Sequence, residues 1–282
     1  MKHLIDPGPS RKGWHRLQTV LRCPRLYALK YKGERPRSDM APAEALVKGS
    51  MIHMGIAHHY ALQMEEWKGR ESEIFTPEES VIELAERQPD GHRATWLGYV
   101  DSILEVLSAY QLHWHSENWI TKAVEHELMV HVFDDDRDES LLYTQRVDAI
   151  WEHPITGKIF YIDHKSAKNW SGRSLGQYSI SGQMVGYQMI GQAKYKERWG
   201  GVLLNVIEWP KSGKAPMFTR VPVEPAPYAV DNFKSTILHA EHLVHKYAER
   251  EPMDWPGAFH GGACWNFGPC KFLSNCQWGG SK

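Results

Sequence analysis

The sequence predicts an α/β fold in which helices flank a mixed central sheet, with a helical region before the sheet and a cysteine-bearing tail after it. Three observations predict this arrangement. Apolar residues recur at helical spacing up to about residue 120, and strand-like runs dominate between residues 121 and 210. A last helical pattern then leads into a Gly-rich tail. With 282 residues, the chain is long enough for one large domain with a full core.

The first region, residues 1–120, contains four predicted helical segments. They span residues 10–33, 41–67, 75–88 and 92–114. Pro24 is expected to break the first segment directly after Cys23, because proline lacks the backbone N–H that a helix interior uses. Thr76 followed by Pro77 predicts the start of the third segment, since threonine caps helices and proline fits their first turn.

The second region, residues 121–210, is the predicted core. Its strands are expected at residues 122–133, 143–153, 157–166 and 201–209, with one helix at 175–200 before the last strand. The segment "PITG" between the second and third strands predicts a tight hairpin. The third region, residues 211–282, holds a helix at 227–251 and the cysteine-bearing tail. We expect the three regions to form a single domain.

The charge balance limits the functional classes. The 33 Lys and Arg residues nearly equal the 34 Asp and Glu residues, which argues against a uniformly basic protein but leaves room for a local basic channel. Twelve Trp and twelve Tyr residues could serve packing or base stacking. The N-terminus lacks a signal-peptide pattern and no window reaches the length of a membrane span. We therefore expect a cytoplasmic protein without a membrane partner, either bacterial or phage-encoded and acting in the host cytoplasm.

Two acids and a lysine stand at the end of the predicted hairpin. If the chain turns near residues 154–157, the numbers of facing residues add up to about 311, so Asp148 faces Asp163. Facing carboxylates repel each other, and a divalent cation would remove the repulsion. Lys165 leaves the same strand face as Asp163. This pattern predicts a metal-activated hydrolytic site. The alternative is a salt-bridged cluster at the end of a sheet, which is common at protein surfaces.

The order of these residues resembles the PD-(D/E)XK nuclease superfamily. Asp148, followed after fifteen residues by Asp163-His164-Lys165, is similar to its signature, with Val147 where the signature has proline. The predicted order of strand, strand, strand, helix and strand also resembles the family core. Two more motifs resemble the RecB-like branch of the family: Gly-x-x-x-His ending at His53, and Gln-x-x-x-Tyr at Gln183 and Tyr187.

The resemblance implies a restriction-endonuclease-like core and a function. It implies a metal-dependent DNA exonuclease that hydrolyses phosphodiester bonds at DNA ends or on single strands. The process would be phage recombination, DNA repair or CRISPR adaptation, with a protein partner from one of these pathways. A non-catalytic nucleic-acid-binding module of the same fold is one alternative. A four-cysteine zinc protein that mediates interactions is another.

The resemblance also implies roles for single residues. A bound Mg²⁺ or Mn²⁺ ion would be held by oxygen donors and one imidazole, a set that both metals accept. Lys165 would orient the attacking water or stabilise negative charge. The implied ligands are Asp148, Asp163, His53 and the main-chain carbonyl of His164; Gln183 and Tyr187 would shape the site and hold DNA, and Glu127 is a further acid that would approach the metal.

The four cysteines predict one metal centre. Cys23 precedes the predicted core, and Cys264, Cys270 and Cys276 follow it with five residues in each gap. Disulfides are not expected in the cytoplasm. The layout resembles the iron–sulfur members of the RecB-like and AddB-like nucleases, which implies a 4Fe–4S cluster that staples the two chain ends. The usual first gap in these relatives is two residues, so zinc stays open as an alternative.

Overall fold

The computed structural model describes residues 2–5, 8–33, 43–209, 214–258, 260–265, 269–273 and 276, without the side chains of residues 172 and 173. The first two residues of the helical segment predicted at 41–67 lie outside the described residues, as does part of the predicted tail. All four cysteines lie within them.

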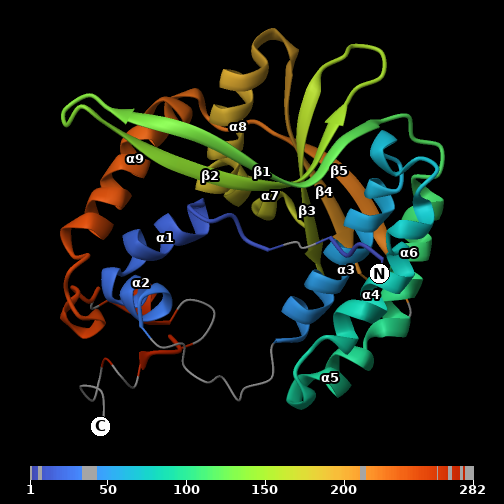
Figure 1. Ribbon diagram of the computed structural model, residues 1–282, viewed down its shortest axis with the longest axis horizontal. Coiled ribbons are helices and arrows are strands. Elements are labelled where there is room, and N and C mark those ends of the chain that lie inside the picture. The colour runs from blue at the N-terminus through green and yellow to red at the C-terminus, as the bar shows by residue number, and fades with distance from the viewer. Residues whose placement is uncertain are drawn as a thin grey trace.

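A mixed sheet of five strands forms the centre of the fold (Figure 1). Its order is β1 (Ile120–Asp134), β2 (Glu139–Glu152), β3 (Ile159–Ala167), β4 (Trp199–Glu208) and β5 (Met217–Val223). Neighbouring strands are antiparallel except β3 and β4, which are parallel. A parallel pair needs a crossover connection, and the helical segment between β3 and β4 supplies it. The mixed sheet flanked by helices was predicted from the sequence and is confirmed.

Ten α-helices surround the sheet in the described part of the chain, together with four short 3₁₀ turns at residues 65–67, 71–73, 196–198 and 252–254. The helices are α1 (Trp14–Arg22), α2 (Pro24–Tyr31), α3 (Glu44–Ala61), α4 (Pro77–Glu86), α5 (Asp90–Leu97), α6 (Val100–His113), α7 (Gly172–Ser179), α8 (Gly182–Tyr195), α9 (Pro227–Lys246) and α10 (Gly261–Cys264). None of the described helices is long and apolar enough to cross a membrane.

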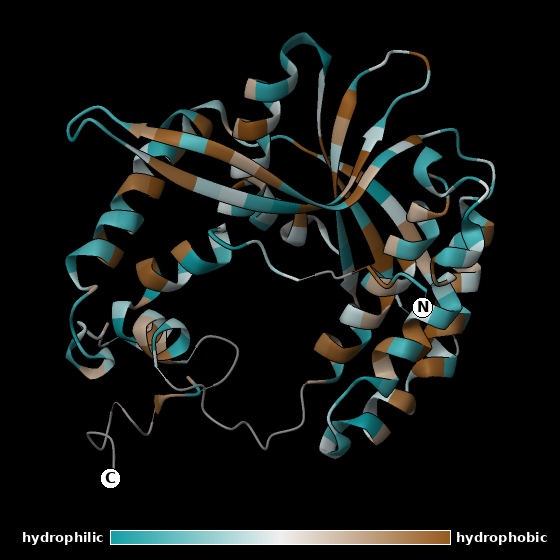
Figure 2. Cartoon of the chain, in the orientation of Figure 1, coloured by the Kyte–Doolittle hydropathy of each residue, from teal (hydrophilic) through white to brown (hydrophobic). Residues whose placement is uncertain are grey.

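The helices cover both faces of the sheet and create two apolar cores (Figures 1 and 2). On one face, helices α3 to α6 pack against Trp151 and Ile162. On the other, α1, α2, α8 and α9 pack against Val147 and Tyr161. Each fully buried large apolar side chain contributes about 1.5–3 kcal/mol to folding. The sheet is therefore held between two layers of helices.

Local signals explain where several helices begin. Thr76 accepts the backbone N–H of Glu79 at 3.2 Å, and the Glu79 carboxylate accepts that of Thr76 at 2.9 Å. This reciprocal capping box starts α4 at Pro77, as predicted. The N-terminal helix breaks between Cys23 and Pro24, also as predicted.

Three predictions about elements were wrong. The single helical segment predicted at 92–114 is two helices, because α5 ends at Leu97 before Gly98, a poor helix former, and α6 begins at Val100. The single helix predicted at 175–200 is two helices, because Ser181 caps a new one by accepting the backbone N–H of Met184 at 3.4 Å. Strand β5 was not predicted. It has only seven residues and includes Pro222, which a strand tolerates at the edge of a sheet, where β5 lies.

Candidate active site

The hairpin of β2 and β3 brings the two predicted acids together. Ala149 pairs with Ile162 and Glu152 pairs with Ile159, so the register is the one predicted from the turn. One step beyond the last pair, the backbone N–H of His164 donates to Oδ2 of Asp148 at 2.5 Å. At this point β3 leaves β2 and continues only alongside β4. The separation of the strands opens the sheet where the acids lie.

Helix α8 holds the carboxylate of Asp163, which is only 1% exposed. Its Oδ1 accepts a hydrogen bond from Nε2 of Gln183 at 2.8 Å and lies 3.5 Å from the hydroxyl of Tyr187. The Gln183 amide also donates to the Tyr187 hydroxyl at 3.0 Å. Residues four apart share one helix face, so both side chains reach the same carboxylate.

Lys165 places its ammonium group next to the same acid. Its Nζ lies 2.6 Å from Oδ2 of Asp163 and 5.3 Å from the centre of the Tyr178 ring. Burial alone would lower the pKa of Lys165, but the negative charges of Asp163 and Asp148 raise it. The lysine is therefore protonated at neutral pH and supplies the positive charge at this site.

His53 approaches the other acid from α3. Its Nδ1 lies 3.6 Å from Oδ2 of Asp148. Burial and the positive charge of Lys165 lower the pKa of His53 to about 4, so the ring is neutral at neutral pH. A neutral imidazole has a lone pair that can bind a metal ion.

The ring of His164 points away from the acids into the core. Its Nδ1 lies 2.8 Å from Nδ2 of Asn205, which also donates to the hydroxyl of Tyr110 at 2.7 Å. The ring thus anchors the strand end while the backbone of His164 contacts Asp148.

The two buried acids, Asp148 and Asp163, have too little positive charge around them to favour their ionised forms. Burial raises the pKa of both Asp148 and Asp163 to about 6, although the positive charge of Lys165 opposes the rise. Oδ2 of Asp163 is buried and lies against the Lys165 ammonium at 2.6 Å, while Asp148 forms no ion pair with a lysine or arginine within the described residues. Two desolvated carboxylates with one ammonium fit a divalent cation. The donor atoms of His53, Asp148 and Asp163 do not all lie within 4.8 Å of one another among these residues, so sharing one ion requires side-chain movement.

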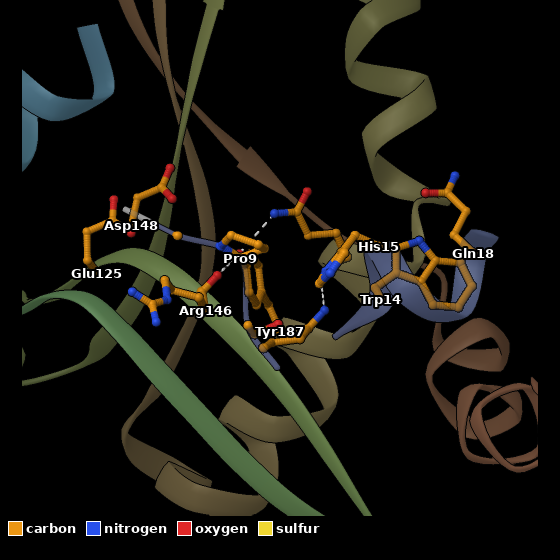
Figure 3. Close-up of a pocket in the computed structure, with 12 residues that line it drawn as sticks. Pro9, Trp14, His15, Gln18, Glu125, Arg146, Asp148 and Tyr187 are labelled. Atoms are coloured by element: carbon orange, nitrogen blue, oxygen red, sulfur yellow. Dashed lines mark hydrogen bonds between the residues drawn. The ribbon is translucent and has the colours of Figure 1, made fainter. Parts of the chain in front are cut away.

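A cavity of about 270 Å³ opens beside Asp148 (Figure 3). Trp14 forms part of its wall and packs so closely on Gly182 that a larger residue there would clash with the indole ring. The lining residues come from the N-terminal segment, β1, β2 and α8: Gly8, Pro9, Ser10, Trp14, His15, Gln18, Glu125, Gln145, Arg146, Asp148, Gln183 and Tyr187. The cavity therefore lies between Asp148, one of the two acids, and the N-terminal helix.

Glu125 is the acidic residue of the cavity that the sequence analysis did not predict. It lies on β1 opposite Asp148, between the paired residues Val124 and His126, and has a φ of 45°. The acid suggested from the sequence, Glu127, lies two residues further on and accepts the backbone N–H of Arg11 at 2.9 Å. The strand register could have revealed Glu125, because extending it from β2 to β1 places this acid opposite Asp148.

The N-terminal segment beside the cavity is strongly basic. Residues 10–33 contain seven Lys and Arg residues and no Asp or Glu, in a chain whose net charge is −1. Some of these cations fix the fold; Arg16 forms a buried ion pair with Glu241 of α9. Others, including Arg11, Lys12 and Lys30, are exposed. Positive charge is thus concentrated next to the acidic site.

The structure brings Cys23 close to the C-terminal tail. Sγ of Cys23 accepts the backbone N–H of Ala258 at 3.4 Å, and Sγ of Cys264 lies 3.9 Å from the carbonyl of the same residue. The backbone N–H of Cys270 donates to the carbonyl of Cys264 at 2.7 Å. No three of the four cysteine sulfurs lie within 4.8 Å of one another.

Comparison with known proteins identifies a family that the sequence matches. Residues 14–277 match the family described as the PD-(D/E)XK nuclease superfamily. No curated protein matches the sequence. One solved structure with some similarity is the crystal structure of SSO0001, with a TM-score of 0.31 and 13% sequence identity. The match covers 54% of this chain and 63% of that chain, which is less than two thirds of its length.

Proposed function

The chain belongs to the PD-(D/E)XK nuclease superfamily, whose members cleave phosphodiester bonds of nucleic acids with divalent metal ions, and from this we propose that it is a metal-dependent DNA exonuclease of the RecB-like branch. One observation carries the proposal: the buried carboxylates of Asp148 and Asp163 converge with the ammonium of Lys165 where β3 leaves β2. A salt bridge with Lys165 alone would leave two buried carboxylates beside one ammonium group, and a divalent cation would balance the remaining negative charge.

The metal would be Mg²⁺ or Mn²⁺. The side chains of His53, Asp148 and Asp163 and the main-chain carbonyl of His164 would hold it. Oxygen donors suit Mg²⁺, and the added imidazole favours Mn²⁺. When bound, the ion would supply an activated water and neutralise charge on the scissile phosphate.

The protein side chains would do the remaining work. Lys165 is protonated and would stabilise the negative charge that develops on the phosphate. Gln183 and Tyr187 hold the Asp163 carboxylate in one orientation, so they would position it.

The cavity favours a DNA end or a single strand as substrate. Its volume of about 270 Å³ lies near the lower end of small-ligand pockets, at about 300–1,000 Å³, which suits one nucleotide and not a duplex. The rings of Trp14 and His15 at its wall can stack on a base. The exposed cations Arg11, Lys12 and Lys30 can contact the phosphates of the neighbouring nucleotides in the bound DNA strand.

We also assign the four cysteines to a 4Fe–4S cluster. The contacts of Cys23 and Cys264 with Ala258 support a shared centre between the chain ends. A single zinc ion holds its ligands about 2.3 Å away, so their sulfurs crowd together, whereas an iron–sulfur cube separates them more. The layout of one cysteine before the core and three after it supports the cluster, and a zinc ion is the alternative that metal analysis would identify.

An end-directed nuclease of this kind would act in phage recombination, DNA repair or CRISPR adaptation. The test is digestion of end-labelled single-stranded, double-stranded and closed circular DNA, with Mg²⁺, with Mn²⁺ and with EDTA. We expect linear substrates to shorten from an end and circles to survive, with no product in EDTA. Cleavage of the closed circles would show that the protein is an endonuclease and not an exonuclease. If no substrate is cut with either metal but DNA is bound, the chain is a non-catalytic binding module.

A further inference from the structure

A second group of metal-binding side chains lies at the tip of the long hairpin of β1 and β2. Asp134 ends β1, Glu139 begins β2, and His242 projects from α9, which runs beside this tip (Figure 1). We propose that these three residues form a binding site for a divalent transition-metal ion, separate from the catalytic site.

The three donor atoms converge. Nε2 of His242 lies 2.9 Å from Oδ2 of Asp134 and 3.6 Å from Oε1 of Glu139. Among the described residues, this is the only set of three His, Cys, Asp or Glu side chains whose donor atoms all lie within 4.8 Å of one another. Asp134 and Glu139 flank one hairpin turn, and His242 comes from a helix far along the chain, so the packing of α9 against the hairpin builds the set.

The buried carboxylate of Asp134 points to an ion. Its side chain is 5% exposed. Within the described residues, neither Oδ2 of Asp134 nor Nε2 of His242 makes a hydrogen bond, although the two atoms are only 2.9 Å apart. Neither atom is engaged in a hydrogen bond, so both are available as ligands of one ion. A buried polar atom without a partner costs about 1–3 kcal/mol, which a bound cation would remove.

Arg137 is the competing cation. Its guanidinium lies 3.9 Å from Oδ2 of Asp134 and 3.9 Å from Oε1 of Glu139, beyond hydrogen-bonding distance, and its side chain is 53% exposed. The other nearby cation, Lys234, pairs with Asp135 at 3.1 Å. Neither positive charge satisfies the buried oxygen of Asp134.

The donor set indicates the class of ion and its role. One imidazole nitrogen with two carboxylate oxygens suits Zn²⁺ or Mn²⁺ better than Ca²⁺, which takes oxygen ligands. Asp134 lies nine residues along β1 from Glu125, which is about 30 Å in an extended strand. An ion there is too far away to take part in catalysis, and it would fasten the tip of the hairpin to α9.

The experiment titrates the protein with Mn²⁺ and follows the electron paramagnetic resonance signal of the free ion. The difference between added and free Mn²⁺ gives the number of bound ions. The starting protein is the Asp148→Asn/Asp163→Asn double variant, so the count does not depend on the proposed catalytic metal. Mn²⁺ prefers oxygen and nitrogen to thiolates, which limits binding by the cysteines. We expect one bound equivalent, and none after His242→Gln or Asp134→Asn is added. Since Asp134 is buried and its variant can fail to fold, the partly exposed His242 provides the second test.

Asp138→Asn is the matched control. It removes one negative charge from the same loop at a φ of 50°, which asparagine tolerates, and the bound Mn²⁺ should remain. Arg137→Ala should also leave the one bound equivalent of Mn²⁺ in place. The proposal is overturned if the starting variant binds no Mn²⁺, or if His242→Gln leaves the count unchanged. Loss of Mn²⁺ in Arg137→Ala or Asp138→Asn would overturn it as well, because the ion would then depend on loop charge or loop structure and not on the three ligands.

Discussion

The backbone N–H of His164 donates to the carboxylate of Asp148 at 2.5 Å, directly after the last paired residues of β2 and β3. The carboxylate takes the place of a strand carbonyl, so it fixes the end of β3 relative to β2. The carbonyl of His164 and the side chains of Asp163 and Lys165 belong to the same strand end. This hydrogen bond therefore fixes Asp148 relative to the strand end that carries Asp163 and Lys165.

Replacing the charged groups should remove DNA cleavage. We expect Asp163→Asn or Lys165→Ala to lower the cleavage rate by at least about 10²- to 10³-fold, because the first removes a charged metal ligand and the second removes the positive charge that stabilises the phosphate. Single-turnover digestion of end-labelled DNA measures this. The control is Lys168→Ala, which removes a half-exposed lysine paired with Glu44. Activity at the wild-type level in a folded Lys165→Ala protein would remove Lys165 from the site.

Replacing His53 should weaken metal binding more than DNA binding. His53→Ala removes an imidazole near Asp148, and we expect the Mn²⁺ affinity to fall roughly tenfold or more, since ligand-sphere changes cost about 10–100-fold. DNA affinity in EDTA should stay the same, because phosphate contacts determine it. Calorimetric titration with Mn²⁺ measures the first quantity and fluorescence anisotropy the second. Unchanged Mn²⁺ affinity would show that His53 is not a ligand.

Neutralising the exposed cations beside the cavity should reduce the salt dependence of DNA binding. Each phosphate contact contributes about 0.9 to the slope of log K against log salt, so Arg11→Gln/Lys12→Gln should lower the slope by about one to two. Lys158→Gln, in the turn at the opposite end of β3, is the control. If the control lowers the slope as much as the double variant, the N-terminal segment has no special role in binding DNA.

Removing Cys23 should destabilise the protein and deplete its iron together. Binding that exists only in the folded state adds to folding free energy, and each kcal/mol lost lowers the melting temperature by about 2–4 °C. Anaerobic purification followed by iron, sulfide and zinc assays and thermal melts tests this in Cys23→Ala. Full iron content with wild-type melting would exclude Cys23 as a ligand, and zinc without iron in the wild type would identify a zinc centre.

A buried histidine away from the active site should make stability depend on pH. Nε2 of His58 accepts the backbone N–H of Ile5 at 3.1 Å, and Nδ1 lies 2.9 Å from the carbonyl of Phe75. Burial lowers the pKa of His58 to about 4 in the folded protein, against about 6.5 in the unfolded chain. Between these values the unfolded chain binds more protons, so stability decreases as pH falls from 6.5 to 4, by up to about 3 kcal/mol.

The measurement is urea unfolding at several pH values. His58→Gln keeps an acceptor for Ile5 but cannot titrate, so its stability should fall less than that of the wild type over this range. His115→Gln, at an exposed position, should behave like the wild type. Equal pH profiles for the wild type and His58→Gln would contradict the prediction.

The sequence predicted the sheet and the meeting of Asp148 with Asp163 because both depend on short-range rules. Strand periodicity and the turn at residues 154–157 determine the register of β2 and β3. What it did not predict depends on contacts between distant segments. Glu125 faces the cavity only because β1 pairs with β2, and Trp14 lines it only because α1 packs against α8. The cluster of Asp134 and His242 likewise requires α9 to reach the hairpin tip.

The docking of the N-terminal helices onto the tail has a consequence for synthesis on the ribosome. The backbone N–H of Arg25 donates to the carbonyl of Pro256 at 3.0 Å, and the guanidinium of Arg22 donates to the carbonyl of Ala263 at 3.0 Å. Helix α1, which these contacts help to hold, carries the Trp14 wall of the cavity. The N-terminal helices are thus held by residues that are synthesised much later. The wall of the cavity gains these contacts only after residues 256–263 have left the ribosomal tunnel, so a chain that stops before them has its acidic pair beside a wall that lacks this support.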